Sequence, residues 1–290
     1  MKLNTQIPDL EKRMSFEGLE FDYLKNKYKN IAFNCRHWDG SVNHGKYLYA
    51  TEGFITIPQN YDLSFVKNNY QGLITPIGKI KEMYGEHIPV FTINGVSNYN
   101  EFWIVEKKDH IPFNKKIDGV CAIQNIYHTG MEGDIVHLRP KIFQDINLPN
   151  FIKHTYGRSP WGGQHYQGHP HRTPSSPKNL QTMMRYRFRL CLESTYHPIW
   201  SHDWITERIF DCFKVKTIPI YWGCYNIEEK VPKELFVDLR EFENVNDALN
   251  SVREITEQEF NDKTEKAYQF VNDCKIGNIQ KLEEILKELN

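Results

Sequence analysis

The chain has 290 residues, of which 40% are hydrophobic, 13% aromatic and 25% charged. This length and composition exclude a small module, a disordered chain, a collagenous chain and a coiled coil, and they predict either two domains or one large α/β unit. The net charge of −1 leaves no excess of positive charge to hold a polyanion, so we do not expect nucleic acid as a main partner.

The amino-terminal part alternates strand-like runs with helical segments. Short runs of β-branched or aromatic residues lie beside Gly, Pro or Asn at 30–34, 46–49, 72–75 and 88–92. Residues 62–69 and 78–84 fit short helices between these runs. This alternation predicts a parallel sheet covered on both faces. The polar stretch 98–116 is interpreted as the entry to a second domain.

The carboxyl-terminal part has the pattern of a second α/β unit. Strands are predicted at 119–123, 185–192, 217–222 and 235–238, and helices at 138–146, 203–214 and 245–290. The stretch 156–178 is rich in Gly, Pro and His, which predicts a long loop of the kind that often forms a lid. Leucine and isoleucine residues at helical spacing between 276 and 289 predict a packed helix at the carboxyl end.

The cysteines and the hydropathy pattern indicate where the protein works. The six cysteines are widely spaced and form no CxxC pair, which favours reduced thiols in a reducing compartment. No run of about 18 apolar residues occurs, and residues 1–22 hold no apolar run of signal-peptide length. We therefore expect a soluble chain without an integral membrane segment, located in the cytoplasm.

Several enzyme classes lack their sequence fingerprints here. No GxGxxG or GxxxxGK[ST] follows a strand, and HExxH, GxSxG and CxxC do not occur. There is also no Asp-x-Asp pair, which many metal-dependent sugar transferases use to hold a divalent ion, so a sugar transferase with this sequence should be metal-independent. His165, His169 and His171 have no neighbouring carboxylate or Cys to complete a metal site, and a solvated loop is the favoured interpretation.

The segment from Tyr186 to Phe242 has the outline of a nucleotide-sugar site. A helix is predicted to open with Thr206-Glu207-Arg208 behind a strand, and its free backbone N–H groups and positive dipole end suit a diphosphate. Glu207 can accept hydrogen bonds from ribose or sugar hydroxyls, and Arg208 can donate to phosphate oxygens. The alternative is that both residues only cap and decorate a helix.

Four motifs in this segment resemble the α-1,3/4-fucosyltransferases of glycosyltransferase family 10. They are Tyr186-Arg-Phe-Arg-Leu-Cys-Leu-Glu-Ser194, Trp204-Ile-Thr-Glu-Arg208, Ile218-Pro-Ile-Tyr-Trp-Gly223 and Pro232-Lys-Glu-Leu-Phe-Val237. In the first half of the chain, only Leu48-Tyr-Ala-Thr-Glu52 is similar to a family element. Four motifs in the same order over about fifty residues are far more specific than a lone glycine pattern.

The resemblance implies an α/β GT-B glycosyltransferase with two Rossmann-like domains facing a cleft. Residues 1–115 would bind the acceptor, 116–270 would bind the nucleotide sugar, and a helix at 271–290 would pack back on the first domain. The implied activity is inverting transfer of L-fucose from GDP-fucose, the donor substrate, to a hydroxyl of a glycan acceptor, with no cofactor required.

The resemblance also implies roles for individual residues. Glu207 would engage the ribose or the sugar of the donor, and Arg208 would stand at the phosphates in place of the family's lysine. Ser194 takes the place of the family's asparagine, and Trp204 replaces another aromatic residue. Arg139 looks like the arginine that grips the diphosphate. These substitutions leave the donor identity open, because Ser194, Trp204 and Arg208 all fall at donor-contacting positions.

The donor-binding roles of Arg139 and Arg189 each have an alternative explanation. Arg139 is either a phosphate ligand or an ordinary cation on a helix surface. Arg189, predicted to bind the donor, alternates with apolar residues along its strand and is either part of a phosphate clamp or part of a polar strand face.

By the same resemblance, a carboxylate of the first domain deprotonates the acceptor hydroxyl. Glu52 would be this catalytic base, and Glu101, Glu106 and Asp62 are its rivals.

Two other functions remain open. The same GT-B scaffold could use another nucleotide sugar, for example a UDP- or GDP-linked pentose or hexose. A non-catalytic carbohydrate-binding protein with a transferase-like fold belongs to a different class. The missing anchor of Golgi-resident relatives favours a bacterial or viral-type enzyme. The sequence names neither the acceptor, the linkage nor the oligomeric state.

Overall fold

The computed structural model describes residues 15–16, 28–33, 44–50, 53–93, 95–96, 103–127, 129–158, 160–170 and 176–289. Three residues named above, Glu52, Glu101 and His171, lie outside these described residues.

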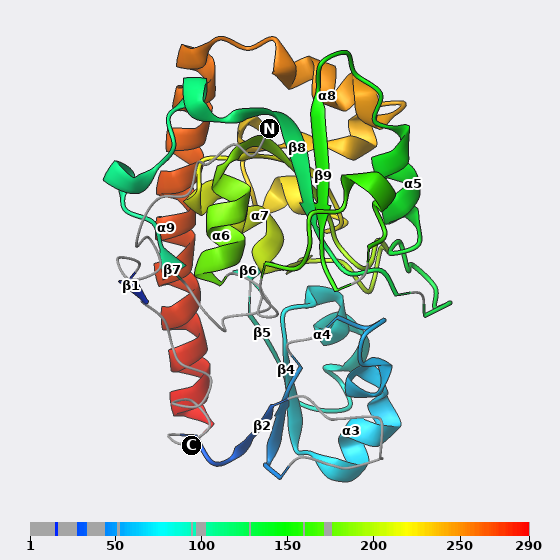
Figure 1. Ribbon diagram of the computed structural model, residues 1–290. Coiled ribbons are helices and arrows are strands. Elements are labelled where there is room, and N and C mark those ends of the chain that lie inside the picture. Colours follow the sequence, from blue (N-terminus) through cyan, green and yellow to red (C-terminus); the bar gives the residue numbers. More distant parts are fainter. Residues whose placement is uncertain are drawn as a thin grey trace.

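A four-stranded parallel sheet organises the amino-terminal unit (Figure 1). Its strands, in spatial order, are β2 (Ile31–Phe33), β3 (Tyr47–Tyr49), β4 (Gly72–Thr75) and β5 (Val90–Thr92). The helices α3 (Leu63–Asn69) and α4 (Gly78–Tyr84) connect β4 to its neighbours in the chain. Leu48, Leu73 and Ile74 are fully buried, as expected for strands covered on both faces.

A five-stranded parallel sheet organises the carboxyl-terminal unit. Its spatial order is β13 (Val237–Asp238), β12 (Ile218–Trp222), β10 (Tyr186–Leu192), β8 (Ile117–Ile123) and β9 (Ile152–Tyr156). The accompanying helices are α5 (Leu138–Asp145), α6 (Pro177–Met184), α7 (Glu207–Lys214) and α8 (Val245–Arg253). The central position of β10 matters for function, because its carboxyl end leads directly into the candidate site.

Short 3₁₀ turns connect many of these elements. They are η1 (Pro58–Tyr61), η2 (Lys107–Asp109), η3 (Phe113–Lys115), η4 (Gly163–His165), η5 (Ile227–Glu229), η6 (Lys233–Leu235) and η7 (Leu239–Glu241).

The structure differs from the sequence prediction at three places. The helix predicted over 245–290 is divided into two helices, 245–253 and 257–288, because Thr256 caps a new helix start. A helix was predicted over 203–214, but α7 begins at Glu207, because Trp204–Ile205 form the strand β11 and Thr206 is the N-cap. Within the predicted loop 156–178, α6 begins at Pro177, with Ser176 as its N-cap. Proline is well suited to the first turn of a helix, where its missing N–H costs no hydrogen bond.

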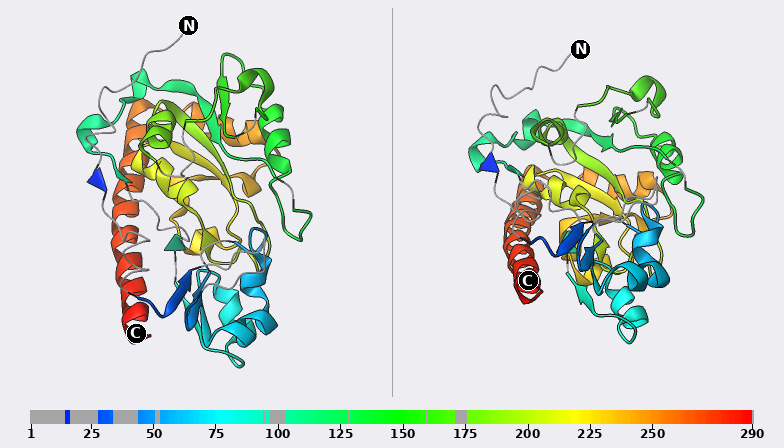
Figure 2. Two further views of the ribbon diagram at one scale, coloured as in Figure 1. Left: turned by 60° about the horizontal axis from the view of Figure 1, so that its bottom comes forward. Right: turned by 90° about the horizontal axis from the view of Figure 1, so that it is seen from below.

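Two features join the units. The strand β11 pairs in parallel with β6 (Gly95–Val96), which follows the amino-terminal sheet in the chain. The long helix α9 (Glu257–Glu288) starts with a capping box at Thr256 and runs alongside both units (Figures 1 and 2). Its Ile285 and Leu286 share one apolar cluster with Tyr49 and Ile74 of the amino-terminal sheet.

Near the chain's first described residues, β1 (Ser15–Phe16) pairs antiparallel with β7 (Trp103–Ile104).

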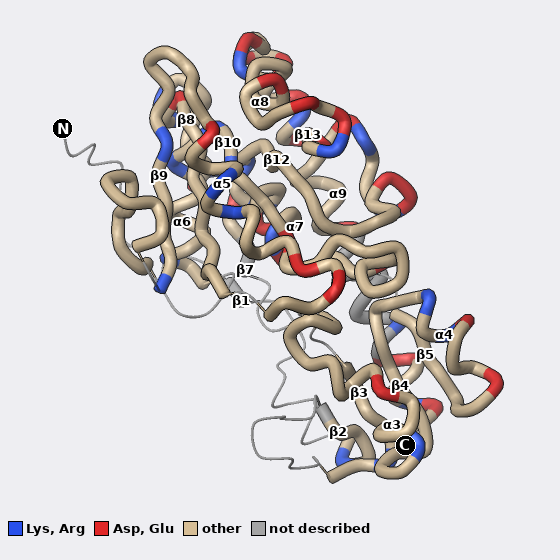
Figure 3. The backbone as a smooth tube through the Cα atoms, turned by 90° about the vertical axis from the view of Figure 1, so that its right-hand side faces the viewer, with Lys and Arg blue, Asp and Glu red and all other residues tan. Residues whose placement is uncertain are grey.

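Charged residues of both signs occur along the described backbone of both units. Figure 3 shows Lys and Arg interspersed with Asp and Glu in both units. Across the part of the chain that the structure describes, no helix combines the length and apolar character needed to cross a membrane.

Candidate active site

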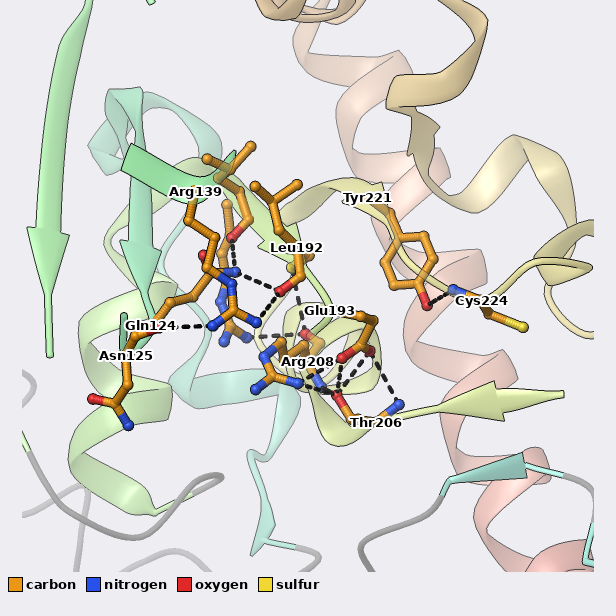
Figure 4. Close-up of polar contacts among 12 residues, drawn as sticks. Gln124, Asn125, Arg139, Leu192, Glu193, Thr206, Arg208, Tyr221 and Cys224 are labelled. Carbon is orange, nitrogen blue, oxygen red and sulfur yellow. Dashed lines mark hydrogen bonds and ion pairs between the residues drawn. The ribbon is translucent and has the colours of Figure 1, made fainter. Parts of the chain in front are cut away.

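The carboxyl end of β10 and the start of α7 are tied together by one buried carboxylate. Glu193, fully buried, accepts hydrogen bonds from the backbone N and Oγ1 of Thr206 at 3.1 and 2.8 Å (Figure 4). Its Oε2 also forms an ion pair with a terminal guanidinium nitrogen of Arg208 at 2.5 Å. Since Thr206 is the N-cap of α7, this network fixes both the helix start and the direction of Arg208.

Gly223, at the end of β12, provides the space for Glu193. A Cβ atom added to Gly223 would lie 2.1 Å from Cγ of Glu193. The turn is held in place because the backbone N of Cys224 donates to the Tyr221 hydroxyl at 2.9 Å. A side chain at position 223 would therefore displace the carboxylate that holds Arg208.

Arg139 of α5 is a buried cation whose hydrogen-bond partners among the described residues are carbonyl groups. Its terminal nitrogens donate to Asn125 O at 2.7 Å and Leu192 O at 2.9 Å, and its Nε has no hydrogen-bond partner among the described residues. Burial, followed by the positive charge of Arg208, lowers the pKa of Arg139 to about 9. An anion placed between Arg139 and Arg208 would remove this repulsion.

Arg208 differs from Arg139 because it has a carboxylate partner. Burial acts to lower the pKa of Arg208, but the charges of Glu193 and Glu207 outweigh burial and raise it. Both guanidinium groups lie at the carboxyl end of β10, where Figure 4 shows their side chains beside Leu192 and Glu193. Glu193 pairs with Arg208, whereas Arg139 has no carboxylate within ion-pair distance among the described residues.

Glu207 occupies the first turn of α7 and is 8% exposed. Its Oε2 atom is buried and accepts no hydrogen bond from any described residue. A buried acceptor without a partner costs about 1–3 kcal/mol. A ligand hydroxyl at this position would satisfy that oxygen, which is the role that the family resemblance implies for Glu207.

Three other predicted donor contacts lie close by but differ in their surroundings. Ser194 is buried directly after Glu193, and its carbonyl accepts from Ile135 N at 3.1 Å. Arg189, 4% exposed, donates to Arg208 O at 2.9 Å, so it is not on a polar strand face. Parallel strands covered on both faces leave no such face. Trp204 is buried in the apolar cluster of the amino-terminal unit.

The base candidates can be placed only in part. The carboxylate of Asp62 accepts from Phe65 N at 2.8 Å and caps α3, so it serves the local structure. Glu106 lies within 2.5 Å of Lys108 in an ion pair. Glu52 lies outside the described residues, and its role as the base stays a prediction.

The sequence interpretation missed Glu193 as a site residue, although Glu193 lies inside the first motif. The available signal was an acidic residue directly after the apolar run Leu190-Cys-Leu192 at the carboxyl end of the strand. Over the described residues, no group of three or more His, Cys, Asp or Glu side chains is arranged to hold a metal ion.

Comparison with solved structures identifies the fold. The chain resembles a crystal structure of an α1,3-fucosyltransferase with a TM-score of 0.51 and 15% identity, covering 91% of this chain and 80% of that one. The DNA-modifying enzyme β-glucosyltransferase matches with a TM-score of 0.50 and 12% identity, covering 84% and 73%. TarM matches with a TM-score of 0.53 and 13% identity, covering 93% and 57%. All three have the GT-B fold.

The fold is that of the GT-B glycosyltransferases, which confirms the fold prediction. Residues 151–286 match the family described as glycosyltransferase family 10 (fucosyltransferase) C-term, which confirms the family resemblance and supports a glycosyltransferase. The α-(1,3)-fucosyltransferase FucT of Helicobacter pylori is 31% identical over 71 residues, which are 24% of this chain and 14% of the relative. The match therefore spans a small part of the relative's length.

Proposed function

We propose that the protein is an inverting glycosyltransferase that moves L-fucose from GDP-fucose to a hydroxyl of a glycan acceptor. The observation that carries the proposal is the pair of cations at the carboxyl end of β10. Arg139 is buried without a carboxylate within ion-pair distance among the described residues, and Arg208 is fixed beside the start of α7. A buried guanidinium without a counter-charge favours an anionic ligand.

The same residues suggest how the leaving group is stabilised. In an inverting transfer, the acceptor oxygen attacks the anomeric carbon as the bond to the diphosphate breaks, and negative charge grows on the diphosphate. Arg139, Arg208 and the backbone N–H groups at the start of α7 would stabilise this charge without moving, because Glu193 and the carbonyls hold them in place. These fixed cations supply the neutralisation that a divalent ion supplies in other transferases, so the proposal requires no metal or cofactor.

The acceptor hydroxyl must lose its proton during the attack. We keep Glu52 as the proposed general base, and such a base accelerates transfer by about 10²- to 10⁴-fold. Glu207 would orient the donor through hydroxyl groups, and Ser194 would lie near the donor at the end of β10. Arg189 would support Arg208 from behind through its carbonyl.

We assign one substrate to each of the two units. Residues 1–115 would bind the acceptor and residues 116–270 the nucleotide sugar. The segment 271–290 would connect the two by packing on the first unit, which the shared cluster of Ile285, Leu286 and Tyr49 supports. The described free cysteines, which are Cys121, Cys191, Cys212 and Cys224, support our proposal of a reducing compartment such as the cytoplasm.

A calorimetric titration of the whole chain with GDP and with UDP tests the donor. We expect tighter binding of GDP, followed by transfer from GDP-fucose to a panel of glycans. Tighter binding of UDP would contradict the fucose assignment and favour another nucleotide sugar. This outcome is tested because Ser194, Trp204 and Arg208 differ from the residues of the family motifs. Binding of glycans without turnover of any nucleotide sugar would instead indicate a non-catalytic carbohydrate-binding protein.

A further inference from the structure

The segment between β10 and α7 crosses from the carboxyl-terminal unit to the amino-terminal unit. The ring of Trp200 stacks on Phe54, with centroids 4.0 Å apart and planes inclined by 8°. Tyr61 lies against the same indole at 6.3 Å. This segment is therefore more than a connection, because its aromatic side chains form part of the contact between the two units.

Trp204 makes a second contact in the same direction. It is 2% exposed and shares an apolar cluster with Leu48, Ala50 and Tyr61 of the amino-terminal unit. A Cβ atom added to Gly53 would lie 2.7 Å from Cζ2 of Trp204, so the indole packs directly on the backbone at position 53. Gly53 follows the proposed base Glu52 in the chain.

Asp203 makes a third contact through its carboxylate. Asp203 has a left-handed backbone conformation, with φ of 63°. Its Oδ1 accepts from Lys230 Nζ at 2.6 Å and from Asn226 Nδ2 at 2.9 Å, which fixes the side chain. A Cβ atom added to Gly78, the first residue of α4, would lie 2.0 Å from Oδ2 of Asp203. The carboxylate thus lies against the start of an amino-terminal helix.

These contacts are only a few residues from the cations of the candidate site. Trp204 and Ile205 form β11, which pairs with β6, and the next residue is Thr206, the N-cap of α7. One short stretch of chain, 203–208, therefore holds the amino-terminal unit at one end and Arg208 at the other. Glu193 fixes the second end through Thr206.

We infer that Asp203 and Trp204 are positioning residues that hold the amino-terminal unit in register with the donor site. The inference rests on the proposed function, since transfer needs an acceptor and a base from one unit to meet a donor bound by the other. A displacement of about 1 Å at such a site can lower the rate about 10²-fold. Trp204 acts through packing against Gly53 and its cluster, and this role differs from the donor contact that the family motif implies.

Two variants of Trp204 separate packing from donor contact. Trp204→Phe keeps a ring in the cluster and removes the indole N–H, whereas Trp204→Ala removes both. We expect Trp204→Ala to lower kcat about 10- to 100-fold, to leave the Kd for GDP within about twofold, and to be largely rescued by Phe. An equal loss of GDP binding in both variants would overturn the inference, because the indole N–H would then be a donor ligand.

Hydrogen exchange provides a readout that does not depend on activity. Trp204→Ala should increase deuterium uptake in residues 53–61 and 78–84 of the whole chain. The matched control is Phe260→Ala, since Phe260 is a buried aromatic residue that packs with Phe113 inside the carboxyl-terminal unit. Phe260→Ala should leave uptake in both segments unchanged, and the same pattern in the two variants would contradict the inference.

A double-mutant cycle at Gly78 tests the carboxylate contact and does not truncate the core. Gly78→Ala should displace Asp203, lower kcat and increase exchange at 78–84. In the Asp203→Gly background, which keeps the left-handed backbone accessible, Gly78→Ala should add no further effect. Additive effects of the two changes would overturn the contact.

The two proposals can fail separately. If the wild-type chain neither binds GDP nor transfers fucose, the proposed function fails, while the exchange measurements still decide whether Asp203 and Trp204 hold the two units together. If GDP binds and transfer occurs but exchange at 53–61 and 78–84 is insensitive to these variants, only the positioning inference fails.

Discussion

Arg189 donates a hydrogen bond to the backbone carbonyl of Arg208, across a distance of 2.9 Å between β10 and α7. These two cations come from two different motifs and have different contacts. Arg189 is buried behind the helix start, whereas the side chain of Arg208 is 20% exposed and reaches Glu193. Arg189 therefore supports the backbone from which Arg208 extends toward the site.

Replacing Glu193 should destabilise the fold and weaken nucleotide binding together. Glu193→Gln removes the charge that pairs with Arg208, and breaking a buried ion pair costs about 3–5 kcal/mol. We expect a decrease of about 3 kcal/mol in the free energy of unfolding, measured by urea denaturation, because an amide can still bond Thr206. The control is Glu228→Gln, whose carboxylate is 56% exposed and pairs with Arg240. A change below about 1 kcal/mol is typical of such exposed pairs.

Removing the positive charge of Arg139 should weaken GDP binding. Hydrogen bonds to charged groups contribute about 1.5–3 kcal/mol, so Arg139→Gln should raise the Kd for GDP about 10- to 100-fold. Arg253→Gln is the matched control, because Arg253 pairs with Asp118 and is part of α8. Calorimetry that gives equal Kd values for wild type and Arg139→Gln would remove Arg139 from the donor site.

How far the sequence predicts the site can be judged from Arg208, Glu193 and Trp204. The helical pattern alone placed the start of α7 too early, at 203. Thr206 followed by Glu207 still indicated the helix start, because Thr is a favoured N-cap and Glu is favourable in the first turn. The role of Glu193 depends on the parallel pairing of β10 with β12, which brings Gly223 beside its side chain. Trp204 packs on Gly53, which lies about 150 residues earlier in the chain. A contact over such a sequence separation cannot be predicted from local sequence patterns.

Elements with a local period and a local stop signal were predicted well. The segment 78–84 matches α4, and 217–222 nearly matches β12, because each has a local period and a local stop signal. The alternation of Arg189 with apolar residues along β10 left a polar strand face open as one interpretation. In the fold, neighbouring strands and α7 cover Arg189, so its charge is met by a carbonyl and not by water.

His110 should make the fold less stable in acid. Its Nε2 lies 3.0 Å from Lys214 O, and its Nδ1 is buried without a partner among the described residues. Burial is the main cause that lowers the pKa of His110 to about 4; Lys216 and Lys116 act in the same direction, against the Lys214 carbonyl and Glu265. Because an unfolded chain has a His pKa of about 6.5, it binds more protons than the folded chain between pH 6.5 and 4.

The free energy of unfolding should therefore decrease by up to about 3 kcal/mol as the pH falls from 6.5 to 4 because of this residue alone. His110→Gln, which can still donate to Lys214 O, should flatten the part of the pH profile above pH 4. Urea denaturation at several pH values measures this difference, with the exposed His87→Gln as the control. Parallel pH profiles for wild type and His110→Gln would contradict the assignment.

Replacing Glu207 should change stability little and weaken donor binding. Its Oε2 is buried without a hydrogen-bond partner in the described structure, so Glu207→Gln removes a desolvated charge and costs the empty protein little. Removing the buried charge is favourable, but Arg208 then loses the attraction of the Glu207 carboxylate. We therefore expect the free energy of unfolding to change by less than about 1 kcal/mol. Binding of the nucleotide should weaken about 10-fold or more, because the amide is a poorer acceptor for ribose or sugar hydroxyls.

Asp211 is the matched control for Glu207, because it is an acid on the same helix that has an ion-pair partner. Asp211, also on α7, forms a buried ion pair with Lys214 at 2.9 Å, so Asp211→Asn should lower stability without a direct effect on the nucleotide. Thermal unfolding and GDP calorimetry on both variants measure the two quantities side by side. A Glu207→Gln variant that loses as much stability as Asp211→Asn and binds GDP normally would show that Glu207 serves the helix, because a structural acid affects folding and a ligand-binding acid affects the ligand.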